Sequence, residues 1–477
     1  ERRAASCPPG DAAACAACAA ACARAPNFVR RADGNISDAY DFDAQLLGEG
    51  AFGSVFQGRH RQSGVIRAIK TVPKGGGREA NLALRREIEI MQQMDHAHIV
   101  RLFDFYEDRR SLHLAMELCE GGTLFDRIAK ARRFPEDEAA LVTRQILRAA
   151  SYMHSNHLAH RDLKPENFLF LGSGGIQDDV LKLTDFGLAR YCPLGQMLRS
   201  HVGTPTYMAP QQVSGTYDTK CDMWSIGVIV YVLLGGQPPF RGDTDPEIKE
   251  RVRLGEWQFE GACWKKVSAD AKSLIRSLLR VSPKVRADAE SSLGHAWIQD
   301  SALEPSGQAA VDAGVVERLK TFETHNRLKQ AALGFVAREL DDASIKPLRQ
   351  AFQALDTNLD GKLTVSEIDD GIAKSGLEAC RKEIKRLTLS VDADGSGAID
   401  YTEFLAATID QERVLTDDVL RKAFVALDHN GDGKISRREL RSAIPVSPHA
   451  VGRIMKEVSR RGSRTIEFDD FKAMMTR

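Results

Sequence analysis

The chain has 477 residues, and its 66 basic and 66 acidic side chains give a formal net charge of zero. Without an excess of positive charge it is not suited to a nucleic-acid polyanion, so we expect no nucleic-acid partner. Hydrophobic residues make up 43% and charged residues 28%, which is typical of a soluble globular chain. No apolar run has the length that a bilayer span needs, and the chain length predicts two to four domains.

Residues 1–39 form an Ala-rich tail that we expect to be disordered. The nine cysteines are an odd number and scattered, so they indicate a reducing compartment and a cytoplasmic protein rather than a disulfide framework. Cys7, Cys15, Cys18 and Cys22 lie in this tail, where a metal site and S-acylation are the alternatives to plain disorder. The chain begins with Glu1, so we expect that N-terminal residues are missing, and membrane association through such residues or an acylated tail stays open.

Patterns of apolar residues divide the remaining chain. Tyr40–Leu118 is strand-rich with one helix expected at Leu82–Met94, and a helix-rich stretch continues to Ile298. Within that stretch the apolar run Trp224–Leu234 is too short for a membrane and predicts a core helix. Residues 305–307 read Pro-Ser-Gly and predict a linker. We therefore expect domains at 40–298 and 343–477, joined by residues 299–342.

The first domain carries a glycine loop and a lysine suited to binding phosphates. Gly48, Gly50 and Gly53 fit the pattern G-x-G-x-x-G, where a backbone without Cβ atoms can lie close over phosphates. Lys70 ends a β-branched stretch and can reach the α- and β-phosphates. Glu87 lies on the next helix pattern and is expected to face Lys70, although a solvated helix face is the alternative.

The segment His160–Asn167 is the strongest local signal for phosphoryl transfer. Asp162 can accept the proton of a substrate hydroxyl, and Lys164 can neutralise charge on the moving phosphoryl group. Asn167 and Asp185, which opens the sequence Asp-Phe-Gly, supply oxygen ligands for Mg²⁺. These motifs in this order and at this spacing predict an ATP-dependent phosphotransferase.

The order of motifs resembles the protein kinase family over about Tyr40 to Ile298, and Lys164 resembles the Ser/Thr class. The resemblance implies an α+β bilobal protein kinase fold, with a β-rich N-lobe and an α-rich C-lobe. It implies that Thr204 bonds Asp162 and Lys164, and that protein Ser/Thr hydroxyls are the substrates. The residues 222–228 and 237–240 look like the calmodulin-dependent kinase group. The ATP contacts that the resemblance implies are Leu47, Gly48, Gly50, Gly53, Val55, Ala68, Lys70, the gatekeeper Met116, the hinge residues Glu117 and Cys119, Glu166, Leu169 and Asp185.

Three positions depart from the family pattern or leave alternatives open. Gln211 replaces a Glu that normally pairs with an Arg, here expected to be Arg286, which keeps a hydrogen bond but loses its charge partner. Thr123 stands where relatives that prefer arginine three residues before the target often carry Glu, so that preference does not carry over. Ser200 is either a regulatory phosphosite that pairs with Arg161 or a loop serine.

The last part of the chain repeats an acidic loop at an interval of 36 residues, beginning at Asp356, Asp392 and Asp428. Calcium loops take oxygen ligands at positions 1, 3, 5, 7, 9 and 12 and need Gly at position 6. All three loops satisfy this pattern, and the second, with four carboxylates, is expected to bind most tightly. The predicted ligands are Asp356, Asn358, Asp360, Lys362 through its carbonyl, Thr364 and Glu367; Asp392, Asp394, Ser396, Ala398 through its carbonyl, Asp400 and Glu403; and Asp428, Asn430, Asp432, Lys434 through its carbonyl, Ser436 and Glu439.

A fourth unit is degenerate, since an alignment on Ile466 places Arg461 and Arg464 at positions 3 and 6 of its loop. We expect three Ca²⁺ sites, none in this unit, and a short strand pair between Ile435 and Ile466. Before the repeat, Val315–Leu340 predicts one amphipathic, basic helix.

A kinase, a basic junction helix and four hands in this order resemble the calcium-dependent protein kinases of plants and protists. That resemblance implies a Ser/Thr kinase that its junction helix restrains and that calcium releases by opening an apolar groove for the helix. ATP, Mg²⁺ and Ca²⁺ are the implied cofactors. A calcium-sensing pseudokinase scaffold is the alternative, but Lys70, Glu87, Asp162, Asn167 and Asp185 are all present. A separate calmodulin is unnecessary when the hands are covalently linked.

Overall fold

The structure is a computed structural model that describes residues 29–31, 34–50, 53–75, 77–301, 313–374, 381–393, 395–443, 448–459 and 463–477. The four tail cysteines, the linker predicted at 305–307, Asp394 and Arg461 lie outside the described residues. Within the described part, no helix combines the length and apolar character that a membrane span requires.

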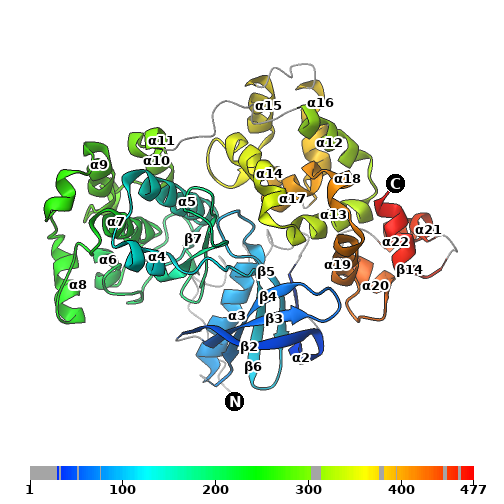
Figure 1. The fold of residues 1–477 in the computed structure, drawn as a ribbon, viewed down its shortest axis with the longest axis horizontal. Coiled ribbons are helices and arrows are strands. Elements are labelled where there is room, and N and C mark those ends of the chain that lie inside the picture. The colour runs from blue at the N-terminus through cyan, green and yellow to red at the C-terminus, as the bar shows by residue number, and fades with distance from the viewer. Residues whose placement is uncertain are drawn as a thin grey trace, which may run out of the picture.

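The N-lobe is a sheet with strand order β1-β5-β6-β4-β3-β2. Its strands pair antiparallel except β1, which runs parallel to β5. Helix α3 lies beside the sheet and buries Leu84, Ile88 and Met91, which recur at helical spacing (Figure 1). The elements are β1 (Arg30–Arg31), α2 (Ile36–Ala39), β2 (Tyr40–Gly50), β3 (Gly53–His60), β4 (Ile66–Pro73), α3 (Gly77–Gln93), β5 (Leu102–Glu107) and β6 (Ser111–Met116).

The folded N-lobe reaches further back than the boundary expected at residue 40. Val29 is buried in the main core, and Ile36 is buried against the sheet. The side chain of Gln92, at the end of α3, donates to the Val29 carbonyl at 3.4 Å. Part of the segment expected to be disordered therefore packs on the N-lobe.

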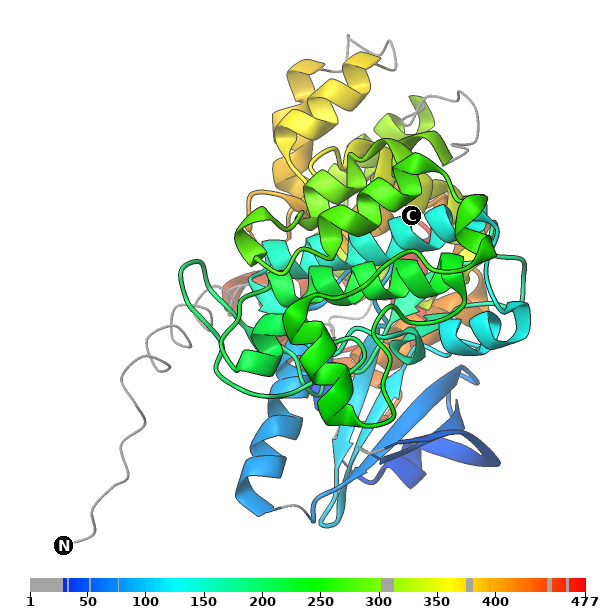
Figure 2. The same cartoon turned by 90° about the vertical axis from the view of Figure 1, so that its left-hand side faces the viewer.

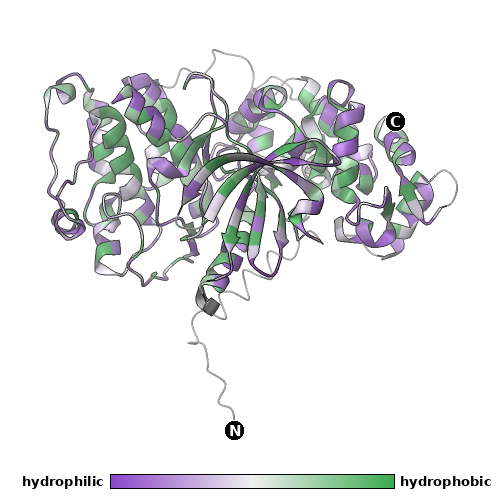
Figure 3. Ribbon diagram, turned by 60° about the horizontal axis from the view of Figure 1, so that its bottom comes forward, coloured by the Kyte–Doolittle hydropathy of each residue, from purple (hydrophilic) through white to green (hydrophobic). Residues whose placement is uncertain are grey.

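The C-lobe is helical and is built around α7 (Lys220–Gly235), which is buried from Cys221 to Leu234 as the apolar run predicted. Apolar residues, green in Figure 3, gather on the inner faces of these helices. The observed β-rich and α-rich lobes confirm the predicted fold class. The other elements are α4 (Leu124–Ala131), α5 (Glu136–Ser155), β7 (Leu158–Ala159), the 3-10 helix η1 (Pro165–Asn167), β8 (Phe168–Phe170), β9 (Leu181–Leu183), β10 (Arg190–Tyr191), α6 (Pro210–Ser214), α8 (Asp245–Leu254), η2 (Ala262–Lys265), α9 (Ala269–Leu278), η3 (Pro283–Val285), α10 (Ala289–Leu293) and α11 (Ala296–Ser301).

The C-terminal domain is helical, with four short strands that pair its loops in twos. β11 pairs antiparallel with β12, and β13 pairs with β14 through the predicted contact of Ile435 with Ile466. Its elements are α14 (Asp342–Leu355), β11 (Lys362–Leu363), α15 (Val365–Lys374), α16 (Arg381–Val391), β12 (Ile399–Asp400), α17 (Tyr401–Thr408), α18 (Gln411–Val414), α19 (Asp417–Leu427), β13 (Lys434–Ser436), α20 (Arg437–Ala443), α21 (Pro448–Val458), β14 (Thr465–Glu467) and α22 (Phe468–Met475).

The junction differs from the single helix that the sequence analysis predicted. It forms α12 (Ala313–Thr324) and α13 (Arg327–Glu339), because Asn326 has extended backbone angles and accepts from Lys329 N at 2.9 Å as the N-cap of α13. The apolar residues of both helices, including Leu319, Phe322 and Leu333, are buried in the core of the C-terminal domain. In this structure the junction therefore packs into the C-terminal domain.

The C-terminal domain lies against one side of the two lobes (Figures 1 and 2). Its contacts include Leu102 at the start of β5, Tyr152 of α5 and Asp95. Asp95 accepts from the backbone nitrogen and hydroxyl of Thr402 at 2.8 and 2.7 Å. Ala97 belongs to the core of the C-terminal domain, whereas Leu359 of the first acidic loop packs on the core of the two lobes. This exchange of apolar side chains makes the interface continuous with both cores.

Candidate functional site

One face of the N-lobe sheet carries the residues predicted to bind the nucleotide. Val55 on β3 pairs with Lys70 on β4, and Ala68 pairs with Met116 at the end of β6. Directly opposed residues and alternate residues of a strand point to the same face. The structure therefore brings together the side chains expected around adenine and the lysine expected at the phosphates.

The glycine loop lies at the tip of the β2–β3 hairpin. Gly48 pairs with Val55 and Gly50 pairs with Gly53, whereas residues 51 and 52 lie outside the described residues. A Cβ at Gly53, where φ is 130°, would clash with the Thr71 carbonyl oxygen. Glycine is needed there to close the hairpin. Leu47, the first predicted ATP contact, lies on β2 and is exposed.

Lys70 links the sheet to helix α3 and to Asp185. Its Nζ lies 2.7 Å from Glu87 Oε1 and 3.4 Å from Asp185 Oδ1. Burial lowers the pKa of Lys70, but the charges of Glu87 and Asp185 raise it above its ordinary value. The ammonium thus stays charged and is held where it can bind phosphate oxygens.

Asp162 is held by the two residues that the kinase resemblance assigns to it. Its carboxylate accepts from Lys164 Nζ at 2.9 Å and from the nitrogen and hydroxyl of Thr204 at 2.8 and 2.7 Å. Lys164 Nζ also donates to the Thr204 hydroxyl at 3.1 Å. Burial raises the pKa of Asp162, but these hydrogen bonds bring it below its ordinary value. The carboxylate is therefore ionised at neutral pH and can accept a hydrogen bond from a substrate hydroxyl.

Asn167 and Asp185 present the oxygen atoms that suit Mg²⁺. The Asn167 amide nitrogen donates to the Asp162 carbonyl at 2.9 Å, so its amide oxygen is the atom offered to a metal. Asp185 has φ of 65°, in the left-handed region that costs a non-glycine residue about 1 kcal/mol or more. In this backbone conformation the Asp185 carboxylate lies beside the Lys70 ammonium, and their ion pair helps to hold it there.

Asp222 supports the catalytic segment, a role that the sequence analysis did not assign. This fully buried carboxylate accepts from the backbone nitrogens of His160 and Arg161 at 2.9 and 2.8 Å and from His154 Nε2 at 3.0 Å. Burial raises its pKa, but the hydrogen bond and charge of His154 bring it below the ordinary value. Its partners lie more than 60 residues away in the sequence, so no local pattern marks the role.

The hinge residue Glu117 turns its side chain away from the predicted adenine site. Its carboxylate accepts from Lys182 Nζ at 3.0 Å, and its backbone nitrogen donates to the Arg101 carbonyl at 2.9 Å. We therefore expect the backbone of residues 117–119, which includes Cys119, to recognise adenine. The remaining predicted contacts, Leu169 on β8 and Glu166 on η1, come from the C-lobe.

Ser200 and Arg161 are partners in the structure. Arg161 Nη1 donates to the Ser200 hydroxyl at 2.9 Å, and the same hydroxyl lies 2.6 Å from the Tyr217 hydroxyl. A phosphate on Ser200 would gain the charge of Arg161 but would lose this packing against Tyr217. The geometry thus leaves both interpretations of Ser200 open.

Gln211 occupies the predicted place beside the buried Arg286. Arg286 Nη2 donates to Gln211 Oε1 at 2.8 Å, and its other hydrogen bonds go to the backbone carbonyls of Lys220, Arg280 and Val281. Burial lowers the pKa of Arg286 to about 10. The guanidinium is therefore satisfied by hydrogen bonds, but it has an amide where a carboxylate would neutralise its charge.

We expect Gln211→Glu to stabilise the C-lobe by about 1 kcal/mol, because hydrogen bonds between charged groups contribute more than neutral ones. Scanning calorimetry should show a rise of about 2–4 °C in Tm. Gln237→Glu, at an exposed position, serves as the control with the same change in net charge. A lower Tm would mean that the lost hydrogen bond from Gln211 to the Val281 carbonyl outweighs the new charge pair.

The three acidic loops of the C-terminal domain share one geometry. In each loop the first Asp accepts from the backbone nitrogen of the sixth residue, at 3.0 Å in the first loop, 2.8 Å in the second and 2.7 Å in the third. The sixth residues have φ of 78°, 88° and 79°, which favours glycine. The final Glu reaches back to the start of its loop. Each glutamate accepts from the backbone nitrogen of the second residue of its loop, which is Thr357, Ala393 or His429, at 3.0, 2.8 and 2.9 Å.

This geometry fits calcium. The Asp356 carboxylate is buried near Asp360 and Glu367, and burial together with these charges raises its pKa to about 7. Burial also raises the pKa of Asp428 in the third loop. Concentrated negative charge of this kind is what a divalent cation neutralises. In the second loop, Asp400 pairs with Lys362 of the first loop at 2.9 Å. The prediction that the second loop binds calcium most tightly counted its four carboxylates and did not include the positive charge of Lys362.

The fourth unit has a different loop. Arg464 takes the place of the sixth-position glycine, and it does not appear among the described non-glycine residues with positive φ. The strand pair of Ile435 with Ile466 nevertheless holds this unit beside the third loop. The described residues thus agree with a structural role for the unit.

Comparisons with known proteins extend over both domains. The protein kinase domain family matches residues 42–298, and the EF-hand domain pair matches residues 345–409 and 417–476. The chain is 39% identical over 449 residues to calcium-dependent protein kinase 5 of Plasmodium falciparum, which covers 92% of this chain and 78% of that protein. It is 38% identical over 448 residues to calcium-dependent protein kinase 9 of Oryza sativa, covering 92% and 77%, and 34% identical over 460 residues to calcium-dependent protein kinase 3 of Plasmodium berghei, covering 94% and 82%. The chain therefore belongs to the calcium-dependent protein kinase family.

Proposed function

We propose that this chain transfers the γ-phosphate of ATP to Ser and Thr hydroxyls of proteins when Ca²⁺ binds its own EF-hands. The observation that carries the proposal is the Asp162 carboxylate, which is ionised and fixed by Lys164 and Thr204. Asn167 bonds the Asp162 carbonyl, and Lys70 pairs with Asp185. The test is phosphorylation of a Ser-containing peptide by the purified chain in calcium and in chelator. Equal rates in calcium and in chelator, whether negligible or not, would contradict it.

Each residue contributes one step to this chemistry. Asp162 orients the substrate hydroxyl and accepts its proton as the phosphoryl group moves. Lys164 offsets charge on the phosphoryl oxygens, and Lys70 orients the α- and β-phosphates. Mg²⁺, which Asn167 and Asp185 would hold, supplies charge neutralisation to the phosphates.

A pseudokinase scaffold is the weaker candidate. Its usual signature is the loss of a metal ligand, the ATP-binding lysine or the catalytic carboxylate. In this chain those residues are present and lie within hydrogen-bonding distance of their expected partners. No observation on the described residues favours the scaffold.

We propose that the junction is the switch. Its helices α12 and α13 pack their apolar residues into the EF-hand domain, which is how an opened hydrophobic groove binds an amphipathic helix. We infer that this arrangement is the calcium-loaded, active one, and that without calcium the junction restrains the kinase domain.

We expect three calcium ions per chain, because basic residues stand at ligand positions of the fourth unit. Native mass spectrometry should find three, and each of Glu367→Gln, Glu403→Gln and Glu439→Gln should reduce the number to two. Asp470→Asn, at the twelfth position of the fourth loop, is the matched control and should leave three. A fourth tightly bound ion that Asp470→Asn removes would contradict the assignment.

A further inference from the structure

The last turn of α13 contacts the N-lobe through three polar interactions. Arg338 Nη2 donates to the Leu102 carbonyl at 2.6 Å, and Arg101 Nη1 donates to the Arg338 carbonyl at 3.1 Å. Arg67 Nη2 lies 2.5 Å from both carboxylate oxygens of Glu339. The Arg67 guanidinium also stacks over the Phe103 ring, 3.5 Å from its centroid. We call these contacts the α13 clasp.

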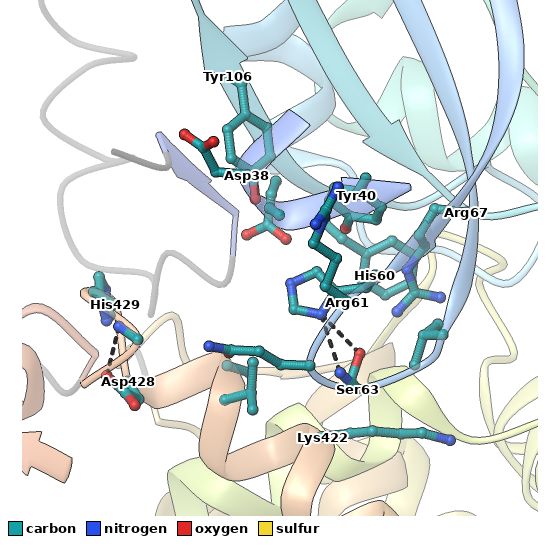
Figure 4. Close-up of a pocket in the computed structure, with 18 of the residues that line it drawn as sticks. Asp38, Tyr40, His60, Arg61, Ser63, Arg67, Tyr106, Lys422, Asp428 and His429 are labelled. Atoms are coloured by element: carbon teal, nitrogen blue, oxygen red, sulfur yellow. Dashed lines mark hydrogen bonds between the residues drawn. The ribbon is translucent and has the colours of Figure 1, made fainter. Parts of the chain in front are cut away.

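The clasp joins the end of α13 to β4, β5 and the residue before β5. Beyond it, a cavity of about 270 Å³ separates the N-lobe from the third calcium loop. Figure 4 shows Tyr40, His60 and Arg67 on the kinase side of this cavity, and Lys422 and Asp428 on the EF-hand side. The end of α13 is therefore one of the points, beside the contact of Asp95 with Thr402, that hold the EF-hand domain against the N-lobe.

Arg101 connects the clasp to the hinge through hydrogen bonds of its backbone with Glu117. Its backbone carbonyl accepts from Glu117 N at 2.9 Å, its backbone nitrogen donates to Glu117 Oε2 at 3.3 Å, and Lys182 Nζ holds the same oxygen at 3.0 Å. Burial raises the pKa of Glu117, but Lys182 and Arg101 bring it below its ordinary value. Arg101 is thus bonded to the junction helix on one side and to a hinge residue on the other.

Departure of α13 would leave this buried cluster short of a partner. Arg101 is 6% exposed, and the Arg338 carbonyl lies in the last turn of a helix, where carbonyls lack partners within the helix and attract cations. A guanidinium that stays buried but loses a hydrogen-bond acceptor destabilises the folded state, because its N–H group is then bonded neither to protein nor to water, unless neighbouring groups move to replace the acceptor. Glu117 Oε1, on the hinge, lies 4.0 Å from Arg101 Nε, so a shift of the Arg101 side chain would act on this hinge residue.

We propose that the α13 clasp sets the affinity for ATP: when α13 docks, it fixes Arg101, and Arg101 with Lys182 orients Glu117 and the hinge backbone that receives adenine. Arg101 is then a positioning residue rather than a catalytic one. The inference rests on the proposed function, in which the docked arrangement is the calcium-loaded one. Because coupling between two sites is reciprocal, an ATP-site ligand should also tighten calcium binding.

The first test uses the unmodified chain. Isothermal titration with the non-hydrolysable analogue AMP-PNP in excess Mg²⁺ should give a Kd about fivefold or more lower in calcium than in chelator, the range typical of allosteric coupling. Equal Kd values in a chain whose phosphorylation rate does respond to calcium would overturn the inference and leave the proposed function standing. A rate that does not respond to calcium would overturn the proposed function itself.

The second test reverses the ion pair of the clasp. Arg67→Glu and Glu339→Arg should each raise KM for ATP about fivefold in calcium, with KM for the peptide unchanged, and the double variant should restore the parent KM. Lys346→Met is the matched control, since it removes the exposed pair of Lys346 with Asp178 across the same two domains. Unchanged KM for ATP in both single variants, or equal changes in both KM values, would overturn the inference.

Discussion

Asp162→Asn should lower kcat by about 10²–10⁴-fold, the contribution usual for a general base, while the chain still binds three calcium ions. Asparagine preserves the shape of the side chain, but it cannot accept the hydroxyl proton or hold the Lys164 ammonium by charge. Steady-state phosphorylation of a Ser-containing peptide in saturating calcium measures the effect. KM for ATP should change little, because Asp162 contacts Lys164 and Thr204 rather than the hinge.

Asp178→Asn is the matched control for this prediction. Asp178→Asn changes the net charge by the same amount as Asp162→Asn, but at an exposed side chain of the C-lobe that lies 3.1 Å from Lys346. Its kcat should equal that of the parent chain. An Asp162→Asn variant that retains more than about a tenth of the parent kcat would fall outside the range for a general base and would reject the role assigned to Asp162.

The sequence predicted those features that depend on short motifs. The glycines of the nucleotide loop, the segment His160–Asn167 and the three acidic loops each carry their chemistry within about a dozen residues, so spacing alone indicates what they do. The pairing of Ile435 with Ile466 was also accessible, because Ile466 aligns with the hydrophobic residue at the same position of the other loops and EF-hand units usually come in pairs. Local patterns of this kind need no knowledge of tertiary contacts.

Other features could not be predicted because distant parts of the chain create them. Asp222 becomes a support of the catalytic segment only when α7 packs beneath it. The docking of Asp95 on Thr402 joins residues 307 positions apart, and neither residue belongs to a motif. The break between α12 and α13 did have a local signal, since Asn326 is a favoured N-cap residue, but the continuous apolar spacing on both sides of it favoured one helix.

Removal of residues 299–477 should give a kinase whose activity no longer depends on calcium. In chelator, the truncated chain should be at least about fivefold more active than the full chain, since the junction can no longer restrain it. It should remain less active than the full chain in calcium. The reason is that truncation also removes the contacts of Asp95, Ala97 and His98 with the EF-hand domain, which hold the segment after α3.

The matched control is the full chain with Glu367→Gln, Glu403→Gln and Glu439→Gln, which keeps the junction but should bind calcium poorly. We expect it to resemble the parent chain in chelator under both conditions. Peptide phosphorylation is compared for the parent chain, the truncated chain and this variant, each checked for folding by circular dichroism. The comparison distinguishes restraint of the kinase by the junction from support of the kinase by the EF-hand domain. A truncated chain that is folded yet silent in calcium and in chelator would contradict release from autoinhibition. The contacts of the EF-hand domain with residues 95–98 would then be what activates the kinase, because they fix the end of α3 and, through it, Glu87 against Lys70.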